Sequence, residues 1–151
     1  MWLNWADGAY AQNRGALKWM RDEWGLNVIR ASMGVDVDGG YLSARTRELG
    51  KVETIVKNAI DLGVYVIIDW HSHHAEKYVS KSQWFFAEMA EKYGAFPNVI
   101  YETFNEPLDV SWKGILKPYH ESVMKVVRTR DPDNLMVFGT PNWSQDVSAA
   151  A

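Results

Sequence analysis

Four apolar segments, spaced roughly 35 residues apart, constrain the fold of this chain more than any other feature. Each is strand-sized, and each ends in polar residues. They are residues 27–33 (NVIRASM), 64–71 (VYVIIDWH), 98–106 (NVIYETFNE) and 134–140 (NLMVFGT). Near-continuous apolar runs such as VYVII are typical of parallel strands that are covered on both faces. The spacing leaves room for a helix and two loops between consecutive strands.

The intervals between these segments have the periodicity of amphipathic helices. The apolar stripes are Leu17, Met20 and Trp24; Val52, Ile55, Val56, Ala59 and Ile60; Phe86, Met89, Ala90 and Tyr93; and Leu116, Tyr119, Val123, Val126 and Val127. We assign Trp19, Trp24 and Trp84 to the core through these helices. The predicted order is therefore helix and strand in strict alternation, four times over.

Repeated helix–strand units leave two architectures, an open doubly wound sheet or a closed (β/α)8 barrel. No glycine-rich phosphate loop follows any predicted strand, and chemically useful side chains lie at the carboxyl end of each one, as barrel sites require. We therefore expect an α/β fold, a (β/α)8 TIM barrel present only in part. Strands 1–5 and their helices would form one domain over residues 1–151, with residues 3–5 as the tail of the first strand. The C-terminal strands would be missing, and the open edge would favour self-association.

Composition excludes several other classes of protein. The net charge of −3 gives no sign of a nucleic-acid partner, and no apolar run has membrane length. The chain has no cysteine, so it has neither disulfides nor thiolate metal ligands. Its first residues lack the basic and apolar regions of a signal peptide.

The end of the third segment carries the most informative residues, Asn105, Glu106 and Pro107. Pro107 has no backbone N–H to donate to a sheet, so we expect the strand to end there. Glu106 would then lie at the mouth of the sheet, where a carboxyl group can act as the general acid of a glycosidase. The alternative, that these residues merely stop a strand, remains open at this point. Glu102, four residues earlier, is too far away for the second carboxylate of a retaining pair and is expected to be structural.

The second segment ends in a histidine-rich stretch that suggests a rival hypothesis. His71 and His73 have the spacing of a metal-binding pair, with Asp69 or Glu76 as helpers, so a metal-dependent barrel hydrolase is one alternative. For His73 and the adjacent histidine we favour a solvated or loop-ordering role. His71, at the strand end itself, is retained as a candidate site residue.

Three more residues are candidates for the site. Arg30 is near the end of the first segment, where a partly buried guanidinium needs an anionic partner, either a catalytic carboxylate or a structural one. Trp143 follows the fourth segment, and Trp5 lies near the expected first strand. Each indole could stack on a sugar ring, although packing within a loop is the alternative.

Several blocks of the sequence resemble bacterial endo-β-1,4-glucanases (cellulases) of glycoside hydrolase family 5 in order and spacing. The blocks are VIRASMGV, DGGYL, YVIIDWHSHHAE, PNVIYETFNEPL, LKPY, DPDNL and GTPNWSQDV. The resemblance runs over essentially the whole chain. It implies a (β/α)8 barrel that hydrolyses cellulose or related β-glucans with two glutamates and retention of configuration, without a metal or other cofactor.

The resemblance also implies roles for individual residues. Glu106 matches the acid/base, and Asn105 matches the residue that contacts the 2-hydroxyl of the sugar at the cleavage point. Arg30 and His71 match site residues around the nucleophile. Trp143 and Trp5 match aromatic platforms for substrate binding.

One departure from the family matters for activity. The family's nucleophile is a glutamate on the seventh strand, and no glutamate of this chain matches it. We therefore expect the 151-residue chain alone to have little activity; an inactive half-barrel that binds glycan or self-associates is the alternative. The complete parent enzyme is expected to be extracellular. Its preference among β-glycans is left open.

Overall fold

The computed structural model describes residues 12–151, which divide into two compact units. The first unit contains the chain up to His71 together with Asn98–Ile100. The second contains Ser72–Pro97 and Tyr101–Ala151.

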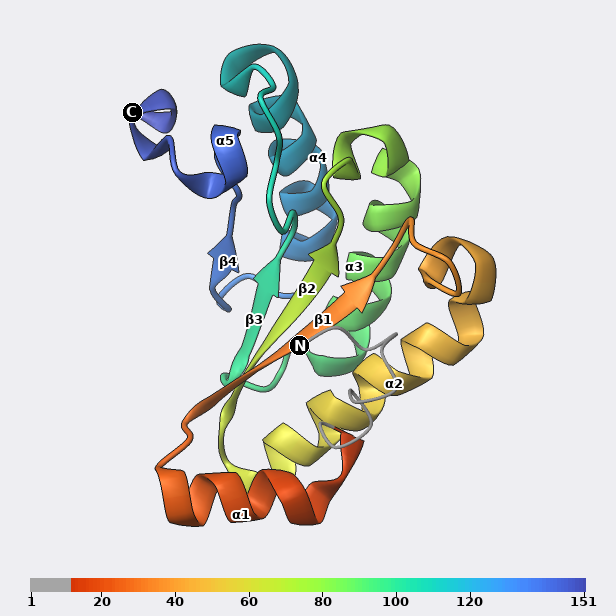
Figure 1. The fold of residues 1–151 in the computed structure, drawn as a ribbon, viewed down its shortest axis with the longest axis vertical. Helices are drawn as coiled ribbons and strands as arrows, with labels where there is room; N and C mark the ends of the chain where they lie inside the picture. The colour runs from red at the N-terminus through yellow and green to blue at the C-terminus, as the bar shows by residue number, and fades with distance from the viewer. Residues whose placement is uncertain (1–11) are drawn as a thin grey trace. The chain divides into compact units, whose positions relative to one another are not determined.

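The first unit contains two helices and two parallel strands (Figure 1). Its elements are α1 (Arg14–Trp24), β1 (Val28–Gly34), α2 (Tyr41–Leu62) and β2 (Tyr65–His71). Helix α2 contacts both strands and α1. The buried stripe of α2, from Val52 to Leu62, recurs every three or four residues and so faces one side.

Local chemistry fixes where these helices begin and end. The side chain of Asn13 accepts hydrogen bonds from the first backbone N–H groups of α1. Gly25 and Gly63 end α1 and α2 in the left-handed conformation, with φ of 67° and 68°, which glycine adopts at no steric cost. The chain is thereby turned into β1 and β2 at the predicted places.

The second unit is mostly helical and holds the end of the sheet. Its helical elements are η2 (Ala75–Tyr78), α3 (Val79–Tyr93), η3 (Trp112–Leu116), α4 (Lys117–Arg128), α5 (Pro141–Ser144) and η4 (Val147–Ala150). Helices α3 and α4 pack on each other. Strand β3 (Val99–Glu102) runs from the first unit into the second, where it pairs with β4 (Met136–Val137).

Hydrogen bonding orders the strands β1-β2-β3-β4. Strands β1 and β2 are parallel over their full length, with Val28 opposite Tyr65 and Gly34 opposite His71. Strands β3 and β4 are also parallel, with Tyr101 opposite Met136. The predicted alternation of helices and parallel strands is confirmed.

Two predicted strands are shorter than expected. Residues 98–106 were expected to be extended up to Pro107, but β3 ends at Glu102. The Thr103 N–H still donates to the Val137 carbonyl at 3.2 Å, while the Thr103 carbonyl accepts a hydrogen bond from the Tyr119 hydroxyl at 2.7 Å. Residues 134–140 likewise pair as a strand only over Met136–Val137.

A buried carboxylate organises the turn between α4 and β4. Asp131 accepts hydrogen bonds from the Tyr101 hydroxyl at 2.7 Å and from the side chain and backbone N–H of Asn134 at 2.8 and 3.0 Å. Burial raises the pKa of the Asp131 carboxyl, but these hydrogen bonds outweigh it and hold that pKa below its usual value. Burial and the Asp131 contact raise the pKa of Tyr101 well above its usual range. The turn is therefore held to β3 by a carboxylate that remains charged.

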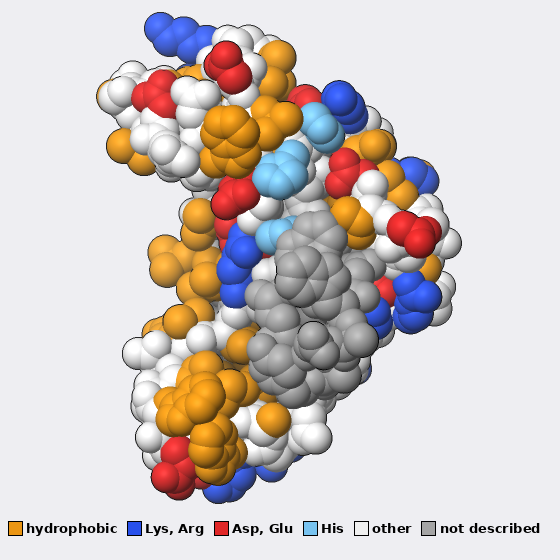
Figure 2. Space-filling model, in the orientation of Figure 1, with side chains coloured by type: hydrophobic (Ala, Val, Ile, Leu, Met, Phe, Trp, Pro, Cys, Tyr) orange, Lys and Arg blue, Asp and Glu red, His pale blue; other side chains and the backbone are white. Residues whose placement is uncertain are grey.

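The assignment of three tryptophans to the core was wrong. Trp19, Trp24 and Trp84 are 52%, 67% and 61% exposed, because they lie off the faces of α1 and α3 that carry the buried residues. Trp19 and Trp24 contact each other edge to face at 4.8 Å, and Figure 2 shows hydrophobic surface over α1. The core tryptophan among the described residues is Trp70, whose ring packs on Tyr41.

Across residues 12–151, none of the helices combines the length and the apolar character that crossing a membrane demands.

Candidate active site

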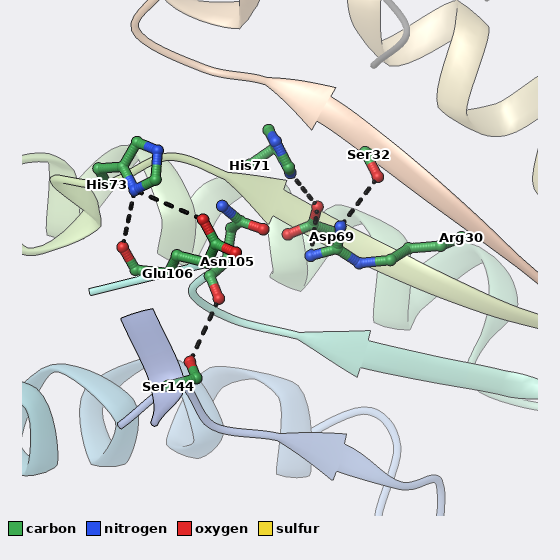
Figure 3. Close-up of polar contacts among 8 residues, drawn as sticks. All are labelled: Arg30, Ser32, Asp69, His71, His73, Asn105, Glu106 and Ser144. Atoms are coloured by element: carbon green, nitrogen blue, oxygen red, sulfur yellow. Dashed lines mark hydrogen bonds and ion pairs between the residues drawn. The ribbon is translucent and has the colours of Figure 1, made fainter. Parts of the chain in front are cut away.

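A first polar group is formed by side chains of β1 and β2, from the middle of β1 to the carboxyl end of β2 (Figure 3). Arg30 and Ser32 alternate onto one face of β1, and Asp69 and His71 onto one face of β2, because side chains two residues apart in a strand point the same way. The register sets Ser32 opposite Asp69. Four polar side chains from two neighbouring strands thus form one cluster.

Asp69 is the centre of this first group. Its carboxylate is fully buried, and Oδ2 lies 3.0 Å from Nη2 of Arg30 and 2.6 Å from Nδ1 of His71. Arg30 also donates from Nη1 to the Ser32 hydroxyl at 3.2 Å. A buried carboxylate needs such partners, since leaving it uncompensated would cost several kcal/mol. The anionic partner expected for Arg30 is therefore Asp69.

The same contact orients the imidazole of His71. A carboxylate accepts but does not donate, so Nδ1 of His71 carries the hydrogen, and in the neutral ring Nε2 is the acceptor. The His71 side chain is only 11% exposed. Asp69 thus fixes both the tautomer and the orientation of the ring.

A second polar group, in the second unit, surrounds Glu106. Glu106 follows β3, directly before the buried Pro107, and its side chain is 48% exposed. His73 donates from Nδ1 to the Glu106 carbonyl at 2.9 Å, and the same nitrogen lies 4.0 Å from Glu106 Oε2. His73 therefore has the loop-ordering role that we favoured, and it holds the backbone that carries the candidate acid.

Trp143 lies on a strained turn that is hydrogen-bonded to the residues directly after Glu106. Asn142, Trp143 and Ser144 all have φ between 55° and 61°, a left-handed conformation that costs non-glycine residues energy. The Trp143 N–H donates to the Pro107 carbonyl at 2.8 Å, and the Asn142 N–H to the Leu108 carbonyl at 3.2 Å. The indole is 49% exposed. This turn presents an aromatic ring and braces the chain immediately after Glu106.

The structure thus places the predicted site residues in two sets. Arg30 and His71 meet at Asp69 in the first unit. Glu106, the mostly buried Asn105 and Trp143 belong to the second. Trp5 lies outside the described residues.

Sequence reasoning treated Asp69 only as a possible metal helper and did not foresee the left-handed turn. For Asp69 the signal was present: an acidic residue two positions before a strand-end histidine predicts a shared face. Among residues 12–151, no group of three or more His, Cys, Asp or Glu side chains is placed to hold a metal ion. The metal-hydrolase hypothesis therefore has no ligand set in this part of the chain.

Helices alternating with parallel strands, with polar side chains on and after the strands, are typical of proteins of the (β/α)-barrel class. Residues 2–151 match the family model of cellulase (glycosyl hydrolase family 5). The chain belongs to this family.

Individual relatives agree with that assignment. Endoglucanase Z of Dickeya dadantii is 50% identical over 132 residues, which cover 87% of this chain and 31% of the relative. An endoglucanase of Clostridium saccharobutylicum is 45% identical over 92% of this chain and 32% of its own length. The crystal structure of the catalytic domain of a Thermobifida fusca endoglucanase superposes with a TM-score of 0.90 at 31% identity, over all of this chain and 49% of that one.

These likenesses confirm the predicted family and the partial (β/α)8 barrel. The chain spans about half the length of the solved relative and about a third of the curated ones.

Proposed function

We propose that this chain supplies the acid/base half of an enzyme that hydrolyses internal β-1,4-glucosidic bonds in cellulose or related β-glucans. The observation that carries the proposal is the placement of Glu106. Its carboxyl group is open to solvent after a parallel strand, while His73 holds the Glu106 carbonyl and the Trp143 turn holds the backbone directly after it. Membership of family 5 supports the same role.

The proposed chemistry at Glu106 has two proton transfers. Glu106 first donates its proton to the glycosidic oxygen, so that the leaving sugar departs as a neutral alcohol. A carboxylate nucleophile then holds the other sugar as a glycosyl ester. Glu106, now ionised, takes a proton from the water that cleaves this ester. We expect the nucleophile to be the glutamate that the resemblance implies on the seventh strand of the barrel, which no glutamate of this chain matches.

The other candidate residues are proposed to bind and orient the sugar. Asn105 would hydrogen-bond the 2-hydroxyl at the cleavage point, and Trp143 and Trp5 would stack on sugar faces. Arg30 and His71, fixed by Asp69, would act near the nucleophile. These roles rest on the resemblance and, for the residues other than Trp5, on the position of each side chain within its own unit.

A β-glucan substrate is supported by a related structure. The Thermobifida fusca endoglucanase has been solved in complex with cellotetraose, and its chain is 31% identical to this one. We propose that the complete enzyme acts outside the cell, because an insoluble polymer cannot enter one.

The test of the proposed function requires a complete catalytic domain. Residues 1–151 are extended by their own downstream sequence or, failing that, by the part of Endoglucanase Z that follows the matched residues and completes its catalytic domain. The domain is expected to release reducing sugar from carboxymethylcellulose. Glu106→Gln should lower kcat on cellotetraose by roughly 10²- to 10⁴-fold, the usual contribution of a positioned general acid.

The matched control is Asp109→Asn, which neutralises an exposed carboxylate three residues further along the same segment. It should leave kcat within about twofold of the parent, since general-acid catalysis needs a positioned group. If Glu106→Gln behaves like Asp109→Asn, the proposed role of Glu106 is wrong.

Self-association is a second candidate property, favoured by the sheet edge at β4. Leu135 and Val137 are 66% and 43% exposed there, and edge strands with apolar side chains promote pairing between copies. Size-exclusion chromatography with light scattering tests this directly. A monomer at all concentrations would rule out the half-barrel dimer.

A further inference from the structure

His120 on α4 joins the ends of two strands through both of its ring nitrogens. Nε2 lies 2.9 Å from the Gly139 carbonyl, and Nδ1 lies 2.8 Å from the Thr103 hydroxyl. Thr103 directly follows β3, and Gly139 comes two residues after β4. One side chain thus bridges the segments that leave both strands.

The partners dictate the protonation of the ring. A carbonyl can only accept, so Nε2 carries a hydrogen; in a neutral imidazole Nδ1 then accepts the hydroxyl hydrogen of Thr103. Burial lowers the pKa of His120 to about 4, against the opposing effect of the Gly139 carbonyl. The ring also packs between Trp112 and Phe138, with centroids 5.7 and 5.0 Å away. His120 is therefore a neutral, oriented bridge at neutral pH.

The bridged segments enclose the residues that carry the proposed acid. A Cβ at Gly139 would lie 2.7 Å from both the Phe104 carbonyl oxygen and Cδ of Pro107, so the two backbones touch there. Phe104 is fully buried and packs edge to face on Tyr119. Residues 104–107 thus follow Thr103 and pack against Gly139, and His120 hydrogen-bonds to both of these residues.

We infer that His120 is a positioning residue for Glu106, setting the carboxyl group at the distance and angle that proton donation requires. This inference rests on the proposed function. His120 would act through Thr103 and Gly139 and would not touch the substrate. A displacement of the acid by about 1 Å is enough to cost up to 100-fold in rate.

The test uses the complete domain and variants that remove one hydrogen bond at a time. Thr103→Val removes the hydroxyl that bonds Nδ1, and Thr103→Ser keeps it. His120→Gln places its amide near the former Nε2 and so keeps only the Gly139 contact. Thr103→Val and His120→Gln should each lower kcat on cellotetraose by roughly 10- to 100-fold, with KM little changed and Thr103→Ser close to the parent.

The choice of substrate separates positioning from damage to the fold. A dinitrophenyl β-cellobioside has a leaving group that departs without a proton, so in the same variants kcat/KM for it, which reports formation of the glycosyl ester, should fall by less than about threefold. Tyr101→Phe is the structural control, because it removes a buried hydrogen bond from the same β3 strand, away from Glu106. It should lower stability without any dependence of activity on the leaving group.

Equal losses on both substrates, or the same pattern in Tyr101→Phe, would overturn the inference. Glu106→Gln, measured in parallel, identifies which claim has failed. If it shows the leaving-group dependence and the His120 and Thr103 variants do not, only the positioning role is wrong. If Glu106→Gln shows none, the proposed function fails, and the positioning role fails with it.

Discussion

Asp69, His120 and Asp131 are buried polar side chains, and each is matched by partners from other segments of the chain. Asp69 holds Arg30 and His71, and His120 bridges two strand ends. Burying these groups without partners would cost several kcal/mol, so each network specifies one arrangement of its segments. Two of these networks hold candidate site residues or the segments that flank them: Asp69 holds Arg30 and His71, and His120 holds the segment that precedes Glu106.

The protonation of His120 leads to a prediction at this scale. Its pKa of about 4 in the folded chain is below the usual histidine value of 6.5, so the unfolded chain binds a proton first as the pH falls. The stabilisation is fully present above pH 6.5 and is lost as the pH falls towards 4. At about 1.4 kcal/mol per pKa unit, the loss should reach about 3 kcal/mol.

Urea unfolding of the chain between pH 7.5 and 4 measures this loss, because that range includes the pKa of His120 in both the folded and the unfolded chain. His120→Gln cannot titrate, so its unfolding free energy should fall less over that window. Equal pH slopes in the parent and the variant would contradict the prediction. Loss of the Asp131 contacts belongs to lower pH, because the pKa of that carboxyl is held below 3.8.

At the scale of secondary structure, periodicity correctly predicted the helices and the alternation of helices and strands along the chain. Val52, Ile55, Val56 and Ala59 are all fully buried, as their spacing required. The stripe on α4 is also buried, but it includes His120, which the sequence showed only as a histidine within a helical pattern. A histidine on an apolar stripe signals a buried polar contact, yet its partners, Thr103 and Gly139, are set by tertiary structure.

Strand ends and loop conformations were predicted less well for a physical reason. Hydrophobic pattern reports burial, and residues 103–106 are largely buried without being paired as a strand. The left-handed turn at Asn142–Ser144 contains no glycine, the residue that would have indicated a positive φ from the sequence. The conformation of these segments also depends on tertiary contacts, such as the hydrogen bond from the Tyr119 hydroxyl to the Thr103 carbonyl, which a local pattern does not report.

A pair of glycine substitutions tests the packing of these elements. Gly139→Ala places a methyl group 2.7 Å from Phe104 and Pro107 atoms and should lower the unfolding free energy by about 1 to 3 kcal/mol. Gly50→Ala, in the exposed interior of α2 with nothing within 4 Å, should raise it by roughly 0.5 to 1 kcal/mol. Thermal and urea unfolding report both changes. A neutral Gly139→Ala would show that the two segments are not in close contact.

At the scale of the whole molecule, the chain matches about half of a solved family 5 catalytic domain. A retaining glycosidase needs two carboxyl groups about 5 to 5.5 Å apart, and the resemblance assigns only the acid/base to this chain. What the chain does alone therefore depends on which half of the catalytic domain carries each of the two carboxyl groups.

We expect the 151-residue polypeptide alone to hydrolyse carboxymethylcellulose at less than about one hundredth of the rate of the extended domain, since no covalent intermediate forms without the nucleophile. A reducing-sugar assay on equal molar amounts compares the two. Comparable rates would mean that a carboxylate of this chain, or of a second copy, serves as the nucleophile.

The most direct test of the role of Glu106 is chemical rescue of Glu106→Ala in the extended domain. With dinitrophenyl β-cellobioside the first step needs no acid, so the glycosyl ester forms. Its hydrolysis is then slow, because no base activates the water. Azide needs no base; it bonds to the anomeric carbon as the carboxylate leaves. We predict that azide accelerates turnover by at least about tenfold and that the product is β-cellobiosyl azide. No acceleration, or an azide product of α configuration, would contradict the assignment of Glu106 as the acid/base.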